Sequence, residues 1–403
     1  MSPREAGASP VTAQPGPIPA PEDPVAVARA LQPLVRARAD EIEAARRLPP
    51  DFSAQLARHG AYRWWVPARL GGLDASLPAA LRALEVLAEA DASVAWCVFI
   101  AITSSTVLGF VPEATAREVF SRPETLIGGV FAPTGRADAV PGGFRVSGRW
   151  SFASGTANAD WLCASCVFYE GGEPVRGPSG APRTHMVLVP AREAELLLET
   201  WDVMGLCGTG SIDFRLHDVL VPVERVVGWS RVPSFAHPLY AFPQMTLLAS
   251  GFGPIALGLA RAALDQLERL ACEKRPSGST RLLSERADVQ AAIARSEARY
   301  AAAHAWLHEV MERAWATARA GDVVPLEQRR DVRLAALHAG ESAVEVVDAA
   351  YRLAGATALH NRSPLQRVFR DLHAVTQHIA LRPTFYELVG RTFVGIPKDT
   401  EFL

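Results

Sequence analysis

The chain has 403 residues, 49% of them hydrophobic and 21% charged, which is enough for two or three domains of roughly 100–200 residues each. Its formal net charge is -2, from 41 Lys+Arg against 43 Asp+Glu. Since no basic arm stands out, we expect no nucleic acid partner. The five cysteines are an odd number in a long chain, which argues against a disulfide framework.

The beginning of the chain differs in composition from the rest. Residues 1–24 are rich in Pro, Ala and Gly and contain no apolar run, so we expect a disordered tail rather than a secretory signal. No stretch of the whole chain reaches the ~18 uninterrupted apolar residues of a membrane helix. We therefore expect no membrane association and a cytoplasmic location.

Residues 25–123 predict an N-terminal helical domain. Apolar residues recur there at helical spacing, Pro49 and Pro50 interrupt the pattern, and Gly60 ends it. A second long helical pattern runs from Leu77 to Phe110. Its later half is apolar on all sides, which is typical of a buried helix.

Residues 124–232 predict a small antiparallel β-barrel domain. The stretch GGFRVSGRWSFAS alternates between two sets of side chains with a period of two. One set includes Phe144, Val146, Trp150, Phe152 and Ser154. Further short apolar runs, HMVLVP, ELLLETWDV and SIDFRLHDVLVP, are divided by Gly and Pro and read as additional strands.

Two cysteines in this region, Cys163 and Cys166, form a CxxC pair. No second CxxC follows to complete a set of four cysteine ligands. The pair lies in the apparent strand WLCASCVFY, where residues three apart point to opposite faces. We expect two core residues here and no metal site.

Residues 233–403 return to helical periodicity. Three or four long patterns with short connections predict an antiparallel four-helix bundle. The glycines of GFGPIALG at Gly251 have no strand before them and the wrong spacing for a dinucleotide-binding turn. The chain also contains no GxxxxGK[ST], HExxH or GxSxG pattern.

The stretch GRWSFASG is unusual for a core strand. Trp150 and Phe152 offer flat apolar surface to a planar ligand, Ser154 adds a hydroxyl at the strand end, and Gly155 permits a positive φ. This pattern favours one wall of a pocket for a heteroaromatic ring. The alternative, ordinary core aromatics followed by a Ser-Gly turn, stays open on these residues alone.

Five segments in sequence order resemble the acyl-CoA dehydrogenase fold superfamily. They are WVPARLGG from Trp65, DASVAW from Asp91, the stretch from Phe131 to Trp161, MGLCGTGSIDFRLHDVLVP from Met204 and FRDLHAVTQH from Phe369. The resemblance covers most of the chain beyond residue 25. It implies an N-terminal helical domain, a central β domain and a C-terminal helical bundle, with a homotetramer as the usual assembly.

The C-terminal motif distinguishes the branches of this superfamily. Many of its dehydrogenases carry a catalytic Glu about eight residues past the Asp of the Arg-Asp pair, and here that register falls on Ile379, next to His378. The chain is therefore more similar to the two-component flavin-dependent monooxygenases. Two alternatives remain: a dehydrogenase that uses Glu387 or another acid as its base, and a non-catalytic relative of the fold.

The monooxygenase resemblance implies a cofactor and a reaction. A separate reductase supplies reduced FMN or FAD, with FMN favoured, and O2 adds to the flavin to form a C4a-hydroperoxyflavin. Ser154 is implied to bond flavin N5, and His378 to orient the hydroperoxide or act as a base. The implied substrate is a small aromatic, heteroaromatic or amine-bearing molecule that is hydroxylated or N-oxygenated.

Other residues receive roles from the same resemblance. The predicted flavin contacts are Phe131, Pro133, Trp150, Phe152, Ser154, Gly155 and His373, with Arg275 or Arg281 at the flavin phosphate of a neighbouring subunit. The predicted substrate pocket contains Trp96, Phe99, Ile100, Thr103, Phe131, Trp201 and Phe242. Two further readings stay open: the turn GTGS at Gly208 faces a polar ligand or is a plain β-turn, and Arg370-Asp371 is a site element or an ion pair.

Overall fold

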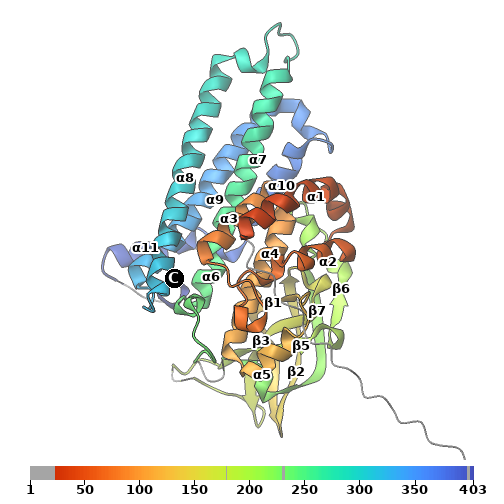
Figure 1. The fold of residues 1–403 in the computed structure, drawn as a ribbon, viewed down its shortest axis with the longest axis vertical. Helices are drawn as coiled ribbons and strands as arrows, with labels where there is room; N and C mark the ends of the chain where they lie inside the picture. Colours follow the sequence, from red (N-terminus) through yellow and green to blue (C-terminus); the bar gives the residue numbers. More distant parts are fainter. Residues whose placement is uncertain (1–22, 178, 229–231, 397–399) are drawn as a thin grey trace, which may run out of the picture.

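The computed structural model describes residues 23–177, 179–228, 232–396 and 400–403, and Figure 1 shows their arrangement. The predicted disordered tail lies outside the described residues except at its end, where Pro24 begins the first helix. The N-terminal helices are α1 Pro24–Ala45, α2 Pro50–Arg58, α3 Leu77–Ala88, α4 Ala92–Ser105 and α5 Glu113–Val119.

Side-chain caps fix where the helices that matter for the site begin. The carboxylate of Asp91 accepts a hydrogen bond from the backbone N–H of Val94 at 3.0 Å and so caps α4. The hydroxyl of Ser76 caps α3 in the same way through Ala79. Nearly every residue of α4 is buried, which confirms the buried helix that its apolar sequence predicted.

Two helical segments, Ala92–Phe110 and Gln244–Glu273, are long and apolar enough to cross a membrane by length and composition. In each of them, 89% of the apolar window is buried inside the protein. Their apolar surface is therefore accounted for by packing in the core.

The central domain is one sheet of eight strands. The strands are β1 Ile127–Val140, β2 Gly143–Ala153, β3 Trp161–Glu170, β4 Glu173–Pro174, β5 Thr184–Pro190, β6 Glu195–Leu197, β7 Ile212–Pro222 and β8 Val226–Val227. Their order is β6-β7-β2-β1-β3-β5-β8, with β4 on β3. The order leaves β6 and β8 at the two ends of a path, so among the described strands the sheet is not closed by pairing of its ends.

One pair in this sheet, β1 with β3, is parallel, and the other pairs are antiparallel. The prediction of a fully antiparallel domain is therefore wrong at this pair. The reason is the path of the chain: β2 ends at the edge of the sheet where β1 begins, and residues 154–160 lead from there to the start of β3. Asp160 fixes the crossing, because its side chain accepts from the backbone N–H of Leu126 at 3.0 Å.

Strand β3 is buried on both faces, whereas β2 alternates between buried and exposed residues. Cys163 packs with Leu188 against Val66 of the N-terminal domain, whereas Cys166 packs with Trp150 inside the sheet. The two cysteines thus lie in different apolar clusters, which confirms that they point to opposite faces.

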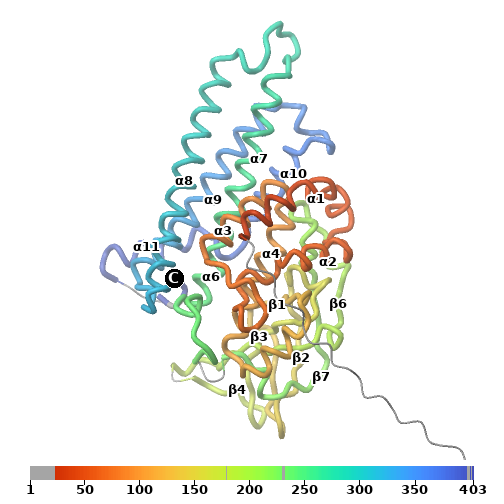
Figure 2. Tube along the Cα trace, viewed as in Figure 1, coloured from red at the N-terminus to blue at the C-terminus, as the bar shows by residue number. Residues whose placement is uncertain are grey.

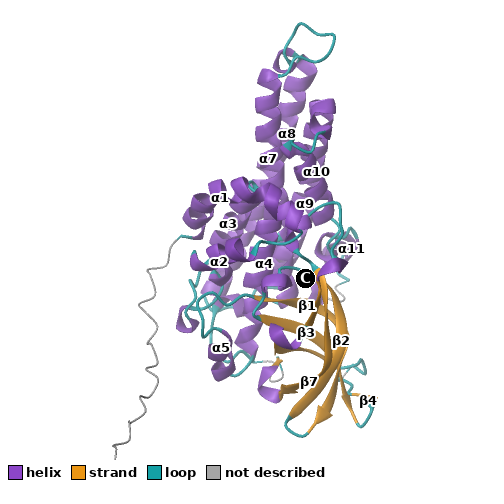
Figure 3. Cartoon of the chain, turned by 90° about the vertical axis from the view of Figure 1, so that its right-hand side faces the viewer, coloured by secondary structure: helices purple, strands orange, loops and turns teal. Residues whose placement is uncertain are grey.

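The remaining helices are α6 Gln244–Ser250, α7 Phe252–Glu273, α8 Ala287–Arg319, α9 Leu326–Ala354, α10 Pro364–Val375 and α11 Thr384–Phe393. Helices α7, α8, α9 and α10 pack together as the predicted four-helix bundle. Figure 2 shows that the bundle extends away from the sheet and that the loop between α7 and α8 lies at its far end. Figure 3 shows the sheet with the N-terminal helices beside it and the bundle above.

Candidate active site

The end of strand β2 departs from the alternation that the sequence predicts. Phe152 has a φ of 63°, in the left-handed region that non-glycine residues rarely adopt. This turn of the backbone leaves the Phe152 side chain 75% exposed, while Ala153 and Ser154 are both buried. The prediction that Phe152 shares one face with Trp150 and Ser154 is therefore wrong.

Trp150 lies inside the sheet. Its side chain is fully buried, its ring stacks on Phe214 with centroids 5.0 Å apart, and its indole N–H donates to the carbonyl of Ser165 at 2.8 Å. The predicted contact between Trp150 and a flavin is corrected on this ground, because the strand turns its indole into the apolar core.

Ser154 is the first member of a chain of hydroxyl groups. Its Oγ accepts from the indole N–H of Trp96 at 2.9 Å and lies 2.6 Å from Oγ of Ser211. Ser211 Oγ lies 2.7 Å from Oγ1 of Thr209, which donates to the carbonyl of Leu206 at 2.8 Å. We call this set, from Trp96 to Leu206, the hydroxyl chain.

The two ends of the hydroxyl chain fix the direction of its protons. An indole N–H can only donate and a carbonyl oxygen can only accept. Thr209 gives its proton to Leu206, so Ser211 gives its proton to Thr209, and Ser154 gives its own to Ser211. The oxygen of Ser154 is thereby left as an acceptor. Trp96, predicted in the substrate pocket, is found here as the partner of Ser154.

His378 lies on the other side of Trp96, just after the end of α10. Its ring centroid is 5.5 Å from that of Trp96 and 4.0 Å from that of Phe252. Nδ1 accepts from the backbone N–H of Ala380 at 3.2 Å, so the proton of the neutral ring is carried by Nε2. The structure thus brings both predicted catalytic residues, His378 and Ser154, against one indole.

The protonation of His378 is shifted by its surroundings. Burial, and to a smaller extent the positive charges of Arg333 and Arg382, together lower its pKa to about 4. A neutral ring with its proton on Nε2 is a hydrogen-bond donor. To act as a base through Nε2 it would need the other tautomer, which would set a proton on Nδ1 against the N–H of Ala380. The geometry favours orientation of an oxygen atom over proton abstraction.

Arg333, on α9, is a site residue that nothing in the sequence pattern indicated. It is 2% exposed, and its guanidinium donates to the carbonyls of Ala380 at 3.2 Å, Met245 at 3.2 Å and Phe402 at 2.6 Å. Within the described residues no carboxylate forms an ion pair with it. Burial lowers its pKa to about 10, so it is a buried cation that clamps the segment carrying His378.

Two cavities of about 510 Å³ each lie beside the sheet. The first, here the apolar cavity, is lined by Val107, Phe110, Phe131, Met186, Gln244 and Met245 among others. The second, here the aromatic cavity, is lined by Phe152, Trp201 and Ser211 together with Arg149 and Asp213, which form an ion pair at 2.6 Å. Ser211 connects the aromatic cavity to the hydroxyl chain.

The other predicted pocket residues divide between these places. Trp201 lies edge-on to Phe152 with centroids 6.3 Å apart, so it belongs to the aromatic cavity rather than with Trp96. Thr103 is fully buried with no hydrogen-bond partner on its hydroxyl, Ile100 is half-buried and Phe242 is buried. Phe99 is fully buried against Trp65 and Phe252 and serves the core.

Several predicted flavin contacts lie elsewhere or differ in exposure. Gly155 has a φ of 73°, which confirms the predicted left-handed turn, and Pro133 is exposed on β1. His373 pairs with Asp348 at 3.0 Å and joins α10 to α9, so its placement at the flavin is corrected: the ion pair holds it on the bundle.

The two predicted phosphate contacts, Arg275 and Arg281, lie in the loop between α7 and α8. This loop is at the end of the bundle remote from the sheet (Figure 2). Each guanidinium bonds a carbonyl of its own loop, Arg275 that of Thr280 and Arg281 that of Glu285. Within a single chain neither arginine reaches Ser154.

The dehydrogenase alternative finds no base at the residues proposed for it. Glu387 is exposed on α11 and pairs with Arg391 one turn along the same helix. Ile379, at the register of the dehydrogenase glutamate, is 55% exposed and apolar.

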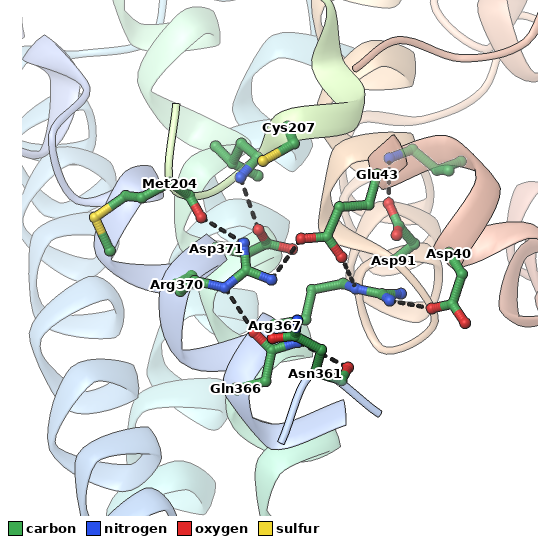
Figure 4. Close-up of polar contacts among 12 residues, drawn as sticks. Asp40, Glu43, Asp91, Met204, Cys207, Asn361, Gln366, Arg367, Arg370 and Asp371 are labelled. Atoms are coloured by element: carbon green, nitrogen blue, oxygen red, sulfur yellow. Dashed lines mark hydrogen bonds and ion pairs between the residues drawn. The ribbon is translucent and has the colours of Figure 1, made fainter. Parts of the chain in front are cut away.

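The Arg370-Asp371 pair forms part of a polar cluster shown in Figure 4. Asp371 accepts from the backbone N–H of Leu206 at 2.7 Å. Arg370 donates to the carbonyl of Met204 and to Glu43 of α1, both at 2.5 Å. The cluster therefore fixes the turn that ends the hydroxyl chain, and it joins this turn to α10 and α1.

The GTGS turn is packed tightly against its neighbours in the fold. A side chain at Gly208 would meet Ile42 at 2.2 Å, and Gly210 has a φ of 52°. The carbonyl of Thr209 accepts from the N–H of Gly155 at 2.9 Å. The turn packs against α1 and α4 and supplies hydroxyls to the chain through Thr209 and Ser211.

Replacing Asp371 with Asn should change the pH dependence of stability. Burial, together with the nearby charge of Asp91, raises the pKa of Asp371 to about 7. A raised carboxyl pKa means that the folded state binds the proton more tightly than the unfolded state does. Protonation of Asp371 therefore stabilises the fold fully below about pH 4, and this stabilisation is lost as pH rises through about 7. The free energy of unfolding of the variant minus that of the parent should therefore rise between pH 4 and 7, by at most about 1.4 kcal/mol per unit.

Denaturant titrations at several pH values would measure this difference. The matched control is Asp202→Asn, whose side chain is 76% exposed. A pH-independent difference for the Asp371 variant would contradict the prediction.

Comparisons with known proteins agree with this architecture. Residues 25–119 match the model for "Acyl-CoA dehydrogenase, N-terminal domain" and residues 250–383 the model for "Acyl-CoA dehydrogenase, C-terminal domain". The chain is 33% identical to an indole-3-acetate monooxygenase of Pseudomonas putida, over 89% of this chain and 90% of that protein. It is 29% identical to the oxygenase component of an FADH2-dependent resorcinol hydroxylase of a Rhizobium species, over 92% and 93%.

A solved structure gives the same picture. The crystal structure of a 3-HSA hydroxylase from Rhodococcus sp. RHA1 superposes with a TM-score of 0.86 at 28% identity, over 94% of this chain and 99% of that one.

Proposed function

Because the chain belongs to the acyl-CoA dehydrogenase family and, within it, to the oxygenase components of flavin-dependent monooxygenases, we propose that it inserts oxygen into a planar aromatic substrate of the indole class. It uses reduced flavin and O2, and as an oxygenase component it depends on a separate flavin reductase. The observation that carries the proposal is the neutral His378, held beside Trp96 and Ser154 with its proton on Nε2.

The residues of the aromatic cavity suit a flavin. Phe152 is 75% exposed and held at a positive φ, which presents a flat apolar ring that a planar heteroaromatic ligand would cover. Trp201 stands edge-on beside it, and Ser211 connects this cavity to Ser154. The bound reduced flavin supplies the electrons that activate O2.

The residues of the hydroxyl chain and of α10 then have distinct tasks. The Ser154 oxygen, with its own proton given to Ser211, accepts a hydrogen bond from a ligand N–H, and a reduced flavin carries one at N5. His378 donates from Nε2 and holds an oxygen atom in place without giving up its proton. The buried rings of Trp96 and Phe252 keep water away from this donor.

The apolar cavity supports an aromatic substrate. Val107, Phe110 and Phe131 provide flat and branched apolar surface. A few polar side chains also line the cavity, those of Ser165, Thr184, His185 and Gln244, a composition typical of sites for small ligands. The P. putida relative is named for indole-3-acetate, and we propose a substrate of that class for this chain.

The proposal extends to assembly and location. A homotetramer is supported by exposed apolar side chains near the end of the chain, such as Phe393, Val394 and Ile396, and by the distance of Arg275 and Arg281 from the site of their own subunit. Cytoplasmic location is supported by five cysteines that are all free of disulfides.

The experiment supplies the purified protein with a flavin reductase, NADH, and either FAD or FMN. Indole-3-acetate, indole and resorcinol are offered in turn under ¹⁸O₂. The expected result is one ¹⁸O atom in the product of an indole substrate, formed in proportion to NADH. Labelling of resorcinol alone would overturn the indole class, and reduction of bound flavin by an acyl thioester without a reductase would overturn the reaction.

Replacing Ser154 with Ala should weaken coupling between flavin oxidation and product formation. The change removes an acceptor worth about 1.4 kcal/mol, or about tenfold in rate, and leaves the buried N–H of Trp96 unpaired. We expect the ratio of hydrogen peroxide to product to rise by about tenfold, with peroxide measured by a peroxide assay and product by chromatography. The control is Ser147→Ala on the same strand, which bonds the N–H of Asp218. Equal coupling in both variants would contradict the role of Ser154.

A further inference from the structure

A second group of polar residues lies where the N-terminal domain meets the bundle. Glu85 on α3 faces His304 and His308 on α8, four residues apart on that helix. Nε2 of His308 lies 2.8 Å from Oε2 of Glu85, and Nε2 of His304 lies 3.5 Å from Oε1. One ligand atom from each of the three residues lies within 4.8 Å of the others.

We propose that Glu85, His304 and His308 bind a zinc ion that joins α3 to α8. Two histidines four residues apart project from one face of a helix, one turn from each other. With bonds of about 2.0–2.1 Å, tetrahedral zinc sets its ligand atoms ~3.3 Å apart. The two measured nitrogen–oxygen distances, 2.8 and 3.5 Å, lie on either side of that value, so small side-chain shifts would complete the site.

The charge balance around Glu85 supports a cation. Its side chain is 6% exposed, and among the described residues its partners are the two imidazoles and the hydroxyl of Tyr300. Arg82, on the same helix, is engaged by Glu312 at 2.8 Å. A buried carboxylate without a permanent positive charge beside it is costly, and a divalent ion would offset that cost.

The surroundings also prepare the ligands. Tyr300 donates to Oε1 of Glu85 at 2.9 Å and so fixes the carboxylate, as outer-shell partners of metal sites do. His304 is 40% exposed, so solvent can reach the ion and fill the fourth position.

A hydrogen-bonded cluster without metal is the competing reading. It accounts for His308 and Tyr300, whose distances to Glu85 are normal hydrogen bonds. It gives the ring of His304 contacts with the rings of Tyr300 and His308 but no good hydrogen bond to the carboxylate, because its Nε2 lies 3.5 Å from Oε1. Zinc gives all three side chains one role: a clamp between the two helical domains, separate from the flavin site.

The test uses the full-length protein, stripped with EDTA, incubated with zinc sulfate and desalted. We expect about one zinc per chain by mass spectrometry of metals, a rise in melting temperature on adding zinc, and visible d–d absorption when cobalt(II) is bound instead. His304→Ala and Glu85→Gln should lose the metal and the cobalt absorption. The control, His360→Ala, removes an exposed histidine outside the group and should keep both.

Two results would overturn the proposal. One is a zinc content in the parent protein no higher than in His304→Ala. The other is an equal loss of zinc in His360→Ala, which would place the metal on surface histidines. The cobalt absorption of the parent protein is measured without any variant and therefore does not depend on whether a variant folds.

Discussion

Replacing His378 with Ala should lower product formation by about 100-fold or more, the scale expected when one positioned hydrogen-bond donor is removed from an active site. The Nε2 proton of His378 is positioned by the N–H of Ala380 on Nδ1, and alanine removes both the donor and its orientation. Oxidation of reduced flavin by O2 should continue. The electrons should therefore appear as hydrogen peroxide, which a peroxide assay and product chromatography under one set of conditions would measure.

The matched control is His373→Ala, at the same end of α10. His373 pairs with Asp348 of α9 and packs on Phe369, so its loss should lower stability while coupling stays high. If His378→Ala kept the coupling of the parent protein, the oxygen-positioning role of the imidazole would be wrong.

Replacing Arg333 with Met should have the second large effect, on stability and on pH dependence together. The guanidinium donates hydrogen bonds to the carbonyls of Ala380, Met245 and Phe402. Each buried carbonyl left unpaired costs about 1–3 kcal/mol of stability. Removing an uncompensated buried charge recovers part of this cost. We expect a net loss of about 3 kcal/mol in the free energy of unfolding, measured by denaturant titration.

The same substitution should raise the acid limit of coupling, which is the pH below which flavin oxidation no longer yields product. Burial is the largest cause that lowers the pKa of His378 to about 4, and the charges of Arg333 and Arg382 contribute the rest. A depressed histidine pKa means that the ring stays neutral until the pH falls through about 4. Without Arg333 this midpoint should shift toward the ordinary value of about 6.5, and coupling should fail at a higher pH.

Two further variants separate charge from geometry. Arg333→Lys keeps the positive charge but cannot serve three carbonyls, so it should lose stability and leave the acid limit near that of the parent. Arg329→Met, one turn earlier on α9, removes an arginine that donates to the carbonyl of Thr400 and should leave the acid limit unchanged. An acid limit that does not move in Arg333→Met would contradict the electrostatic role.

The sequence predicted the order of the domains because hydrophobic periodicity changes from helical to alternating and back, and each change is a local signal. It also predicted the left-handed turn at Gly155, since glycine is the residue that adopts such a turn without strain. It failed at Phe152, because a positive φ at a phenylalanine leaves no trace in a pattern of apolar and polar residues.

The partners of the site residues were beyond sequence reasoning for another reason. Trp96 and Ser154 are 58 positions apart, and Arg333 and Ala380 are 47 apart, so only the packed fold brings them together. Arg333 is one of 41 basic residues, and nothing local marks it as buried. Thr209 and Ser211 could have been predicted. The resemblance had already identified the GTGS turn, and these two residues are the ones in it that carry hydroxyl groups.

The proton order of the hydroxyl chain has a consequence for how this protein can diverge. Ser154 is an acceptor only because a carbonyl two hydroxyls away, that of Leu206, takes the last proton. A valine in place of Thr209 would remove the hydroxyl that donates to Leu206. The hydroxyl of Ser154 could then donate its own hydrogen to a ligand. The turn thus determines whether Ser154 donates or accepts a hydrogen bond to a bound ring. A homologue can therefore change from binding a donor to binding an acceptor while every residue that touches the ligand stays the same.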